Sequence, residues 1–380
     1  DGKKASPHLR DFLVRSMGLV ALATIADIMP LADENRVLVR HGLAGIHANP
    51  PVGLRALMQV AGCLDKRQLT SGMVGFNLGP RINAAGRLER AMRAVEMLTT
   101  DDPDLARLIA EELDQCNANR QQIEQGIVSE SRAMVEEQGG STDLGAIVLG
   151  RRGWHPGVIG IVASRLVETY HRPAIVISLN DDICQGSARS VPGIDLYEAI
   201  RACSEGLIAF GGHAAAAGLK LKEDHFPIFA GRFNEYCKGI MTPELRQREL
   251  QIDDEVSLAS LTPSVVSEIE KLEPFGEGNP RPLLLATNVQ ILGEPRVVGP
   301  RQNHLQLRLL QGDAVVKAIG WNLAEKWKGL TAKTNCSIVF IPSINEWNGR
   351  REVQLEIKDL AVEGEERVEE KFASTSSASR

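Results

Sequence analysis

The chain has 380 residues and is 43% hydrophobic, so it is long enough for two or three domains that each bury a core. The formal charge of −6 gives no overall indication of a nucleic-acid partner, and since no run approaches the roughly eighteen apolar residues that span a bilayer, we expect no membrane span. The six cysteines include no C-x-x-C pair, which disfavours zinc sites and disulfide frameworks and favours a reducing, cytoplasmic compartment.

The first predicted element is a helix over residues 8–25, whose apolar run ends just before Asp27. Asp27 would then be a carboxylate at the end of a buried element, where it is costly unless a metal, a cation or several donors hold it. It could equally cap the following turn, because Asp ahead of Pro commonly starts one. Further helices are expected up to Gly42 and over residues 54–61. The sequence does not begin with Met and starts in the middle of a sequence pattern, so we expect it to be a segment of a longer protein.

Small residues surround Arg81, Asn83 and Arg87 in the segment from Gly75 to Leu88. Such residues allow a ligand to approach the backbone closely, and arginine forks suit an anion. The alternative is a loop that leads into a helix with surface arginines. The spacing alone favours neither interpretation.

A long amphipathic helix is predicted over residues 104–138. Asp102 and Pro103 provide a cap and a first-turn proline, apolar residues then recur at helical spacing, and Gly139 ends the pattern. At 1.5 Å per residue the helix would be roughly 50 Å long, enough to connect two domains. We expect its charged face to be solvated.

Residues 145–240 alternate between strand and helix patterns, which predicts an α/β unit. The predicted elements are strands over 145–149 and 174–179, a hairpin over 183–190, and helices over 158–170, 196–203 and 226–238.

Three glycine-marked segments of this unit suit an anion. Residues 153–160 open onto a helix N-terminus, where free N–H groups and the helix dipole favour negative charge. Ser187 and Ser190 flank Arg189, and residues 211–213 are Gly-Gly-His, where the backbone is accessible. The alternative for the last segment is a glycine turn beside a buried core histidine. Three such segments in one small domain favour a phosphate ligand.

The C-terminal part predicts a small Greek-key barrel of the OB type, because short alternating runs are separated by turn residues. Five strands are expected over 284–292, 304–310, 315–321, 336–341 and 353–357, with a helix over 323–328. Between residues 281 and 358 eleven Lys or Arg stand against six Asp or Glu. With Trp321, Trp327 and Trp347 this basic excess suits a platform for a single strand, although each Trp could instead fill the barrel core.

Six segments of the chain occur in an order that is specific to one family. They are Ala23–Leu31, Gly79–Arg87, Trp154–Gly160, Gly186–Ser190, Gly211–His213 and Pro274–Pro280. By these segments the chain resembles the RecJ family of single-stranded-DNA exonucleases, within the DHH phosphoesterase superfamily. The resemblance extends from Phe12 to about Leu360.

The resemblance implies an α/β fold class with several parts. These are the remainder of a DHH catalytic domain, a linker helix, an α/β DHH-associated substrate-binding domain, an OB-fold nucleic-acid-binding barrel and a disordered tail. Their expected ranges are 1–103, 104–140, 141–240, 245–361 and 362–380.

The resemblance also implies roles for individual residues. Asp27 matches the acid of the family's fourth metal-binding motif, and an arginine-rich turn beside the substrate is matched by Arg81, Asn83 and Arg87. In the DHH-associated domain Arg189 and His213 are expected to act in catalysis by binding the phosphate and offsetting developing charge. The other matching phosphate-binding residues are Ser187, Ser190, Gly211 and Gly212.

In the family the Asp-x-Asp and Asp-His-His motifs, which supply the remaining ligands for Mn²⁺ or Mg²⁺, lie upstream of the position of Asp27, and they are absent from that part of this sequence. A two-metal phosphodiester site needs several carboxylates and imidazoles, so Asp27 alone cannot hold it. The resemblance therefore implies a metal-dependent 5′→3′ exonuclease of DNA repair and recombination, of which this segment alone is expected to be inactive.

Two other functions stay open at this point. One is a catalytically inactive scaffold that binds single strands. The other is an oligonucleotide or nucleoside-phosphate phosphatase of the DHH superfamily, which would lack the OB barrel. The implied partners are single-stranded DNA and a single-strand-binding protein, and the implied state is a monomer.

Overall fold

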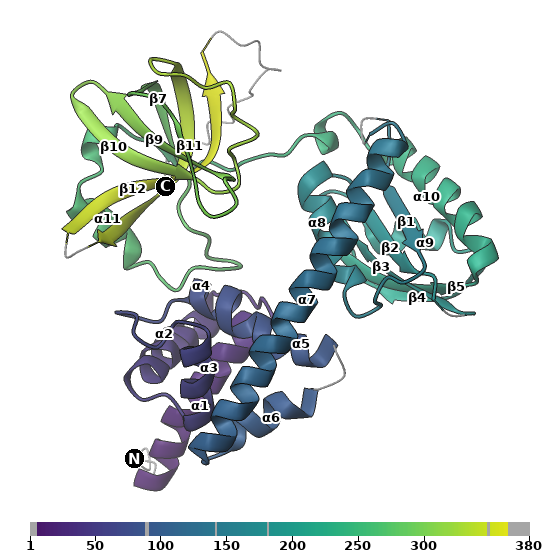
Figure 1. The fold of residues 1–380 in the computed structure, drawn as a ribbon, viewed down its shortest axis with the longest axis horizontal. Helices are drawn as coiled ribbons and strands as arrows, with labels where there is room; N and C mark the ends of the chain where they lie inside the picture. The colour runs from purple at the N-terminus through teal and green to yellow at the C-terminus, as the bar shows by residue number, and fades with distance from the viewer. Residues whose placement is uncertain (1–5, 88–90, 141–142, 181, 348–349, 364–380) are drawn as a thin grey trace, which may run out of the picture. The chain divides into compact units, whose positions relative to one another are not determined.

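The computed structural model describes residues 6–87, 91–140, 143–180, 182–347 and 350–363 (Figure 1). The chain divides into two compact units, of which the first comprises Asp1–Met29 with Asp33–Glu249 and the second Pro30–Ala32 with Leu250–Arg380. Among the helices described here, none is both long and apolar enough to cross a membrane. The predicted disordered tail falls outside the described residues from 364 onward.

Helices form the N-terminal part of the first unit. Ser6 starts the first of them, because its side chain accepts a hydrogen bond from the Leu9 N–H and Pro7 occupies the first turn. The helix predicted up to Gly42 extends to Ala48. The elements are α1 Pro7–Ala26, α2 Asp33–Ala48, α3 Val52–Val60, α4 Ser71–Met73, the π-helix η1 Val74–Leu78, α5 Gly79–Arg87 and α6 Ala91–Thr99.

The predicted long helix is confirmed as α7, Pro103–Glu137, capped by the Asp102 side chain. Figure 1 shows it running from the N-terminal helices to the sheet of the same unit. Ile109 and Leu113 are buried in its first half, and Ile127 and Val135 in its second. The first half of α7 therefore packs in the core of the N-terminal helices, and its second half packs in a core beside the sheet.

A five-stranded sheet follows, in the order β1-β2-β3-β5-β4, with β1 and β2 parallel and the other pairs antiparallel. The hairpin predicted over 183–190 is wrong: the segment is a single strand, because Gly186 pairs with Ile177 on one side and Leu219 on the other. The elements are β1 Ile147–Arg151, α8 Ile159–Tyr170, β2 Ala174–Ser178, β3 Cys184–Arg189, α9 Leu196–Ala202, β4 Leu207–Gly212, β5 Ala216–Leu221 and α10 Phe226–Ile240.

The two faces of this sheet are covered differently. On one face Ala174 and Val176 pack against α8, and on the other Ile175 and Ile177 belong to the core that α9 and α10 cover. Helix α8 contacts β2 and β3. Farther along its face, strands β5 and β4 carry small or polar residues that are exposed, namely Ala209, Gly211, Gly218 and Lys220.

The second unit contains a barrel of the predicted OB type. Its strand order is β6-β7-β11-β12-β10-β9-β8, and an additional β7–β9 pairing closes it. All five predicted strands are present, with β11 and β12 longer than expected. The elements are β6 Asp254–Glu255, α11 Pro263–Glu270, β7 Leu284–Ile291, β8 Arg296–Val298, β9 His304–Gln311, β10 Ala314–Gly320, β11 Asn335–Trp347 and β12 Arg350–Val362.

The helix predicted over 323–328 is wrong, since this segment forms turns. Its apolar residues mimic helical spacing because they fill the barrel, where Trp327 is 8% exposed and Leu323 packs against the same core. The Ala324 N–H donates to the carbonyl of Asn303, in a distant segment, instead of to a helical neighbour.

The short segment Pro30–Ala32 packs within the second unit. Leu31 is 2% exposed, and its N–H donates to the Glu277 carbonyl at 2.6 Å. Two of the family-specific segments are thus in direct contact.

Candidate functional site

Asp27 follows the last residue of α1 and is exposed, so the expectation of a buried carboxylate is wrong. Its position at a helix C-terminus places a negative charge at the negative end of the helix dipole, which does not stabilise it. Ile28 follows in the left-handed region, with φ of 54°, at a cost of roughly 1–2 kcal/mol for a residue with a Cβ. The helix thus ends in a strained turn that presents a carboxylate to solvent.

The segment predicted as an arginine-rich turn is a helix, α5. Its Pro80 does not prevent the helix, because proline is tolerated in the first turn. Arg81 is committed to the fold: its Nε donates to Asp114 at 2.8 Å and its Nη1 to the Asn77 carbonyl at 2.7 Å. Asn83 is exposed on the same helix.

Arg87, at the end of α5, does approach the α/β part of the first unit. Its Nη1 donates to the Gly157 carbonyl at 3.2 Å, in the loop before α8. Burial lowers the pKa of the Arg87 guanidinium, and the charge of Arg189 lowers it further, while Glu124 opposes the shift. Two predicted anion ligands from distant segments are therefore close enough to repel each other.

Arg189 and Ser187 project from β3 beside the first turn of α8. Arg189 Nη1 donates to the Ala188 carbonyl at 2.8 Å and lies 3.4 Å from Ser187 Oγ. Gly160 of α8 lies close to both side chains: a Cβ there would be only 2.9 Å from Ser187 Oγ and 3.4 Å from Arg189 Nη2, so a larger residue would crowd them. Among the described residues no side chain caps α8, so its first turn can attract an anion.

A buried ion-pair network lies behind this cluster and was missed from the sequence. Glu124 of α7, whose side chain is 10% exposed, accepts from Arg120 at 3.0 Å and from Arg165 of α8 at 3.1 Å. Arg120 also donates to Asn117 at 3.0 Å. The prediction that the charged face of this helix is solvated is wrong here. A polar stripe at spacings of three and four residues, all on one helix face, was the available signal.

The cluster carries an excess of positive charge. Arg87, Arg120, Arg165 and Arg189 lie around one buried carboxylate, Glu124, and Arg165 also pairs with the exposed Glu168 at 3.0 Å. The net charge of these six side chains is therefore +2. Burial lowers the pKa of Arg120, and Arg87 and Arg165 lower it further against the effect of Glu124. Uncompensated charge out of water is costly, so the arrangement favours a bound anion.

The remaining predicted residues shape the loop after β4. Ser190 Oγ donates to the Ile194 carbonyl at 2.9 Å, so this hydroxyl anchors the backbone. His213 is exposed, and its Nδ1 accepts from the Ala215 N–H at 3.3 Å, so the alternative of a buried core histidine is wrong. Gly211 and Gly212 end β4 and lead directly into this loop.

Replacing Gly212 with alanine is expected to lower the free energy of unfolding by about 2–3 kcal/mol. Its φ is +152°, and a Cβ there would overlap the carbonyl oxygen of Ala216. Gly211→Ala is the matched control, because nothing lies within 4 Å of its Cβ position. Urea unfolding of both variants gives the comparison, and equal stabilities would contradict the steric assignment.

Trp321, one of the three tryptophans predicted as a platform, is exposed on the barrel. Trp321 is 50% exposed and stands edge-on to His304, with ring centroids 4.9 Å apart. Trp327 is in the core, as the alternative held, and the side chain of Trp347 lies outside the described residues. The register pairs Arg308 with Lys317 on the adjoining strands β9 and β10.

Two family models match the chain. The DHHA1 domain matches residues 143–239 and the RecJ OB domain matches residues 252–359. The first range contains β1–β5 and the Arg189 cluster, and the second contains the barrel.

Curated relatives cover almost the whole chain. The single-stranded-DNA-specific exonuclease RecJ of Bacillus subtilis (strain 168) is 38% identical over 348 residues, 91% of this chain and 44% of its own length. The protein of the same name from Escherichia coli (strain K12) is 34% identical over 364 residues, 94% of this chain and 62% of its own length. The chain thus spans about half the length of these relatives.

The structure of RecJ in complex with Mn²⁺ from Thermus thermophilus matches with a TM-score of 0.79 and 35% identity, over 92% of this chain and 50% of that one. Its complex with Mg²⁺ matches with the same TM-score over 91% of this chain. The fold, the two family models and the relatives agree: the chain contains a DHHA1 domain and a RecJ OB domain and is similar to RecJ proteins over more than nine tenths of its length.

Proposed function

We propose that this chain provides the phosphate-binding and strand-guiding parts of a metal-dependent 5′→3′ single-stranded-DNA exonuclease that acts in DNA repair and recombination. The observation that carries the proposal is the desolvated arginine cluster around Arg87 and Arg189, at the first turn of α8. We retain the predicted division into a catalytic remainder, linker helix, substrate-binding domain and barrel, at 1–103, 104–140, 141–240 and 245–361.

In this proposal the cluster binds a backbone phosphate of the strand. Arg87, Arg189 and the Ser187 hydroxyl supply donors, and the uncapped turn of α8 supplies partial positive charge. Their charge would offset the negative charge that develops during phosphodiester hydrolysis. His213, exposed on its loop, is proposed to contact the same phosphate.

The metal centre is proposed to need residues besides those described. Asp27 would contribute one carboxylate to Mn²⁺ or Mg²⁺, the ions in the structures of the relatives. Among the described residues no group of three or more His, Cys, Asp or Glu lies close enough to hold an ion. These residues therefore do not complete the two-metal site, and their proposed task is to hold and orient the phosphate.

The barrel is proposed to bind the single strand through an exposed aromatic and nearby cations. Replacing Trp321 with alanine is expected to weaken oligo-dT binding by about 1–3 kcal/mol, because one base loses its stacking surface. Fluorescence anisotropy measures the change, with Trp321→Phe as the control that keeps a ring. Equal affinities of Trp321→Ala and the parent chain would remove Trp321 from the interface.

The location and assembly are also proposals. All six cysteines are free and none is paired in a disulfide, which supports a reducing, cytoplasmic compartment. A monomer that meets a single-strand-binding protein on its substrate is consistent with the proposed reaction.

The test is a nuclease assay with Mn²⁺ on 5′-labelled single-stranded DNA. It compares the 380-residue chain with a form that also carries the remaining length of its relatives. We expect 5′→3′ degradation only by the longer form, and its loss on Arg189→Ala. Strand binding without degradation by either form would instead support an inactive scaffold. A phosphatase of short oligonucleotides is disfavoured, because the match to the RecJ OB domain covers residues 252–359.

A further inference from the structure

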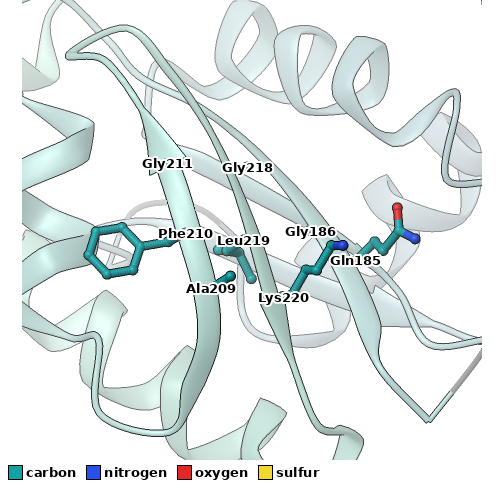
Figure 2. Close-up of a pocket in the computed structure, with 8 residues that line it drawn as sticks. All are labelled: Gln185, Gly186, Ala209, Phe210, Gly211, Gly218, Leu219 and Lys220. Atoms are coloured by element: carbon teal, nitrogen blue, oxygen red, sulfur yellow. The ribbon is translucent and has the colours of Figure 1, made fainter.

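A hollow of about 370 Å³ lies on the uncovered part of the sheet in the first unit (Figure 2). This volume is within the range of small-ligand pockets. Its lining comes from three neighbouring strands, β3, β5 and β4, and from no helix. The lining residues are Gln185, Gly186, Ala209, Phe210, Gly211, Gly218, Leu219 and Lys220.

The strand register connects this hollow directly to the phosphate cluster. Ser187 pairs with Gly218, which pairs with Gly211, so these three positions form one row across the sheet. The next row along the strands is Gln185, Lys220 and Ala209, about 7 Å away at 3.4 Å per residue. Since side chains two residues apart share a face, the hollow adjoins Ser187 and Arg189 on the same surface.

The lining combines a flat backbone surface at its glycines with polar side chains at its edge. Gly218 and Gly211 leave the peptide planes exposed, and Leu219 turns its side chain into the opposite core. Figure 2 shows Lys220 and Gln185 extending to one side and the Phe210 ring to the other. Within the described part of the chain, neither Lys220 nor Gln185 has an ion-pair or side-chain hydrogen-bond partner.

We propose that this hollow is a nucleoside subsite, which holds the sugar and base attached to the phosphate bound by Ser187 and Arg189. A ligand that fills both places must carry an anion next to a flat, partly apolar group, and a nucleotide unit has this form. Lys220 then meets the next phosphate of the strand and Gln185 the edge of the base. This inference rests on the proposed function, because it presupposes the phosphate site.

The test is calorimetric titration of the 380-residue chain with inorganic phosphate, thymidine 5′-monophosphate and the dinucleotide pTpT. Gly218→Val is expected to weaken the binding of both nucleotides about tenfold, because the valine side chain would occupy the hollow. The affinity for inorganic phosphate is expected to change less than about twofold. Gly218 has an ordinary φ, and its Cβ position has only the Gly186 carbonyl near it, at 3.8 Å. The fold is thus expected to accept the substitution, and Gly218→Ala with a thermal melt checks this.

Lys220→Gln is expected to lower the salt slope of oligo-dT binding by about 0.7, the value for one phosphate of a single strand. Lys238→Gln, on α10 behind the opposite face, is the control and should leave the slope unchanged. Unchanged nucleotide affinity in Gly218→Val, with phosphate binding intact, would overturn the subsite and leave the phosphate site standing. Failure of the parent chain to bind phosphate or nucleotide would overturn both.

Discussion

Replacing Glu124 with alanine is expected to lower the free energy of unfolding by about 3–5 kcal/mol, the usual cost of leaving a buried charge without its partner. Glu124 is the carboxylate that Arg120 and Arg165 share. The Arg120 side chain is only 11% exposed, and its Nε has no hydrogen-bond partner among the described residues, so it could not recover its hydration without moving. Arg165 would lose its ion pair with Glu124, but water would compensate part of this loss, because the Arg165 side chain is 53% exposed.

The same helix contains a matched control for this substitution. Arg107 and Glu111 have the same order and the same spacing of four residues, but their side chains are 64% and 58% exposed. Exposed pairs of this kind contribute roughly 0–1 kcal/mol, so Glu111→Ala should be nearly neutral. Urea unfolding of both variants measures the contrast. A cost of less than about 1 kcal/mol for Glu124→Ala would show that the network does not stabilise the junction of α7 and α8.

Replacing Arg189 with alanine is expected to weaken phosphate binding roughly 10- to 100-fold, the value of one charged hydrogen bond. In the parent chain phosphate should raise the melting temperature, because it binds only the folded state, and the variant should lose this rise. Without phosphate we expect the variant to be as stable as the parent or more so, because the substitution removes one desolvated charge that repels Arg87.

Arg152→Ala is the control for the phosphate experiment. It lies in the same domain, but its side chain is 75% exposed and pairs with Glu223. Its phosphate response should equal that of the parent. An equal phosphate response in Arg189→Ala would remove Arg189 from the anion site and withdraw the main support for the proposed function.

The predictions from sequence were most successful where local chemistry determines the structure. The cap at Asp102 and the glycines after Gln138 mark the ends of α7 to within a residue or two. The predicted barrel strands are present because alternating burial is a local signal. Arg87, Ser187 and Arg189 were all named as candidate ligands, and the structure brings them together.

The failures arise where tertiary contacts override local pattern. Arg120 and Glu124 have the spacing of a solvated helical pair, and only the packing of α8 over them makes them a buried network. Glycine and proline made the start of α5 look like a turn, although Pro80 is compatible with the first turn of a helix. The hollow beside Gly218 has no sequence signal, because it arises from strand order and from the extent of α8.

The length of α7 has a consequence for how the first unit unfolds. Its early residues, such as Ile109, help to bury the N-terminal helices, and its late residues, such as Val135, complete the layer over the sheet. Glu130 of α7 also connects the helix to β1 and the loop after it, because it accepts a hydrogen bond from Trp154 Nε1 and forms an ion pair with Arg151. Neither core can come apart without exposing apolar surface on the shared helix. The first unit should therefore melt as a single cooperative block, although its buried residues are divided between the N-terminal helices and the two faces of the sheet.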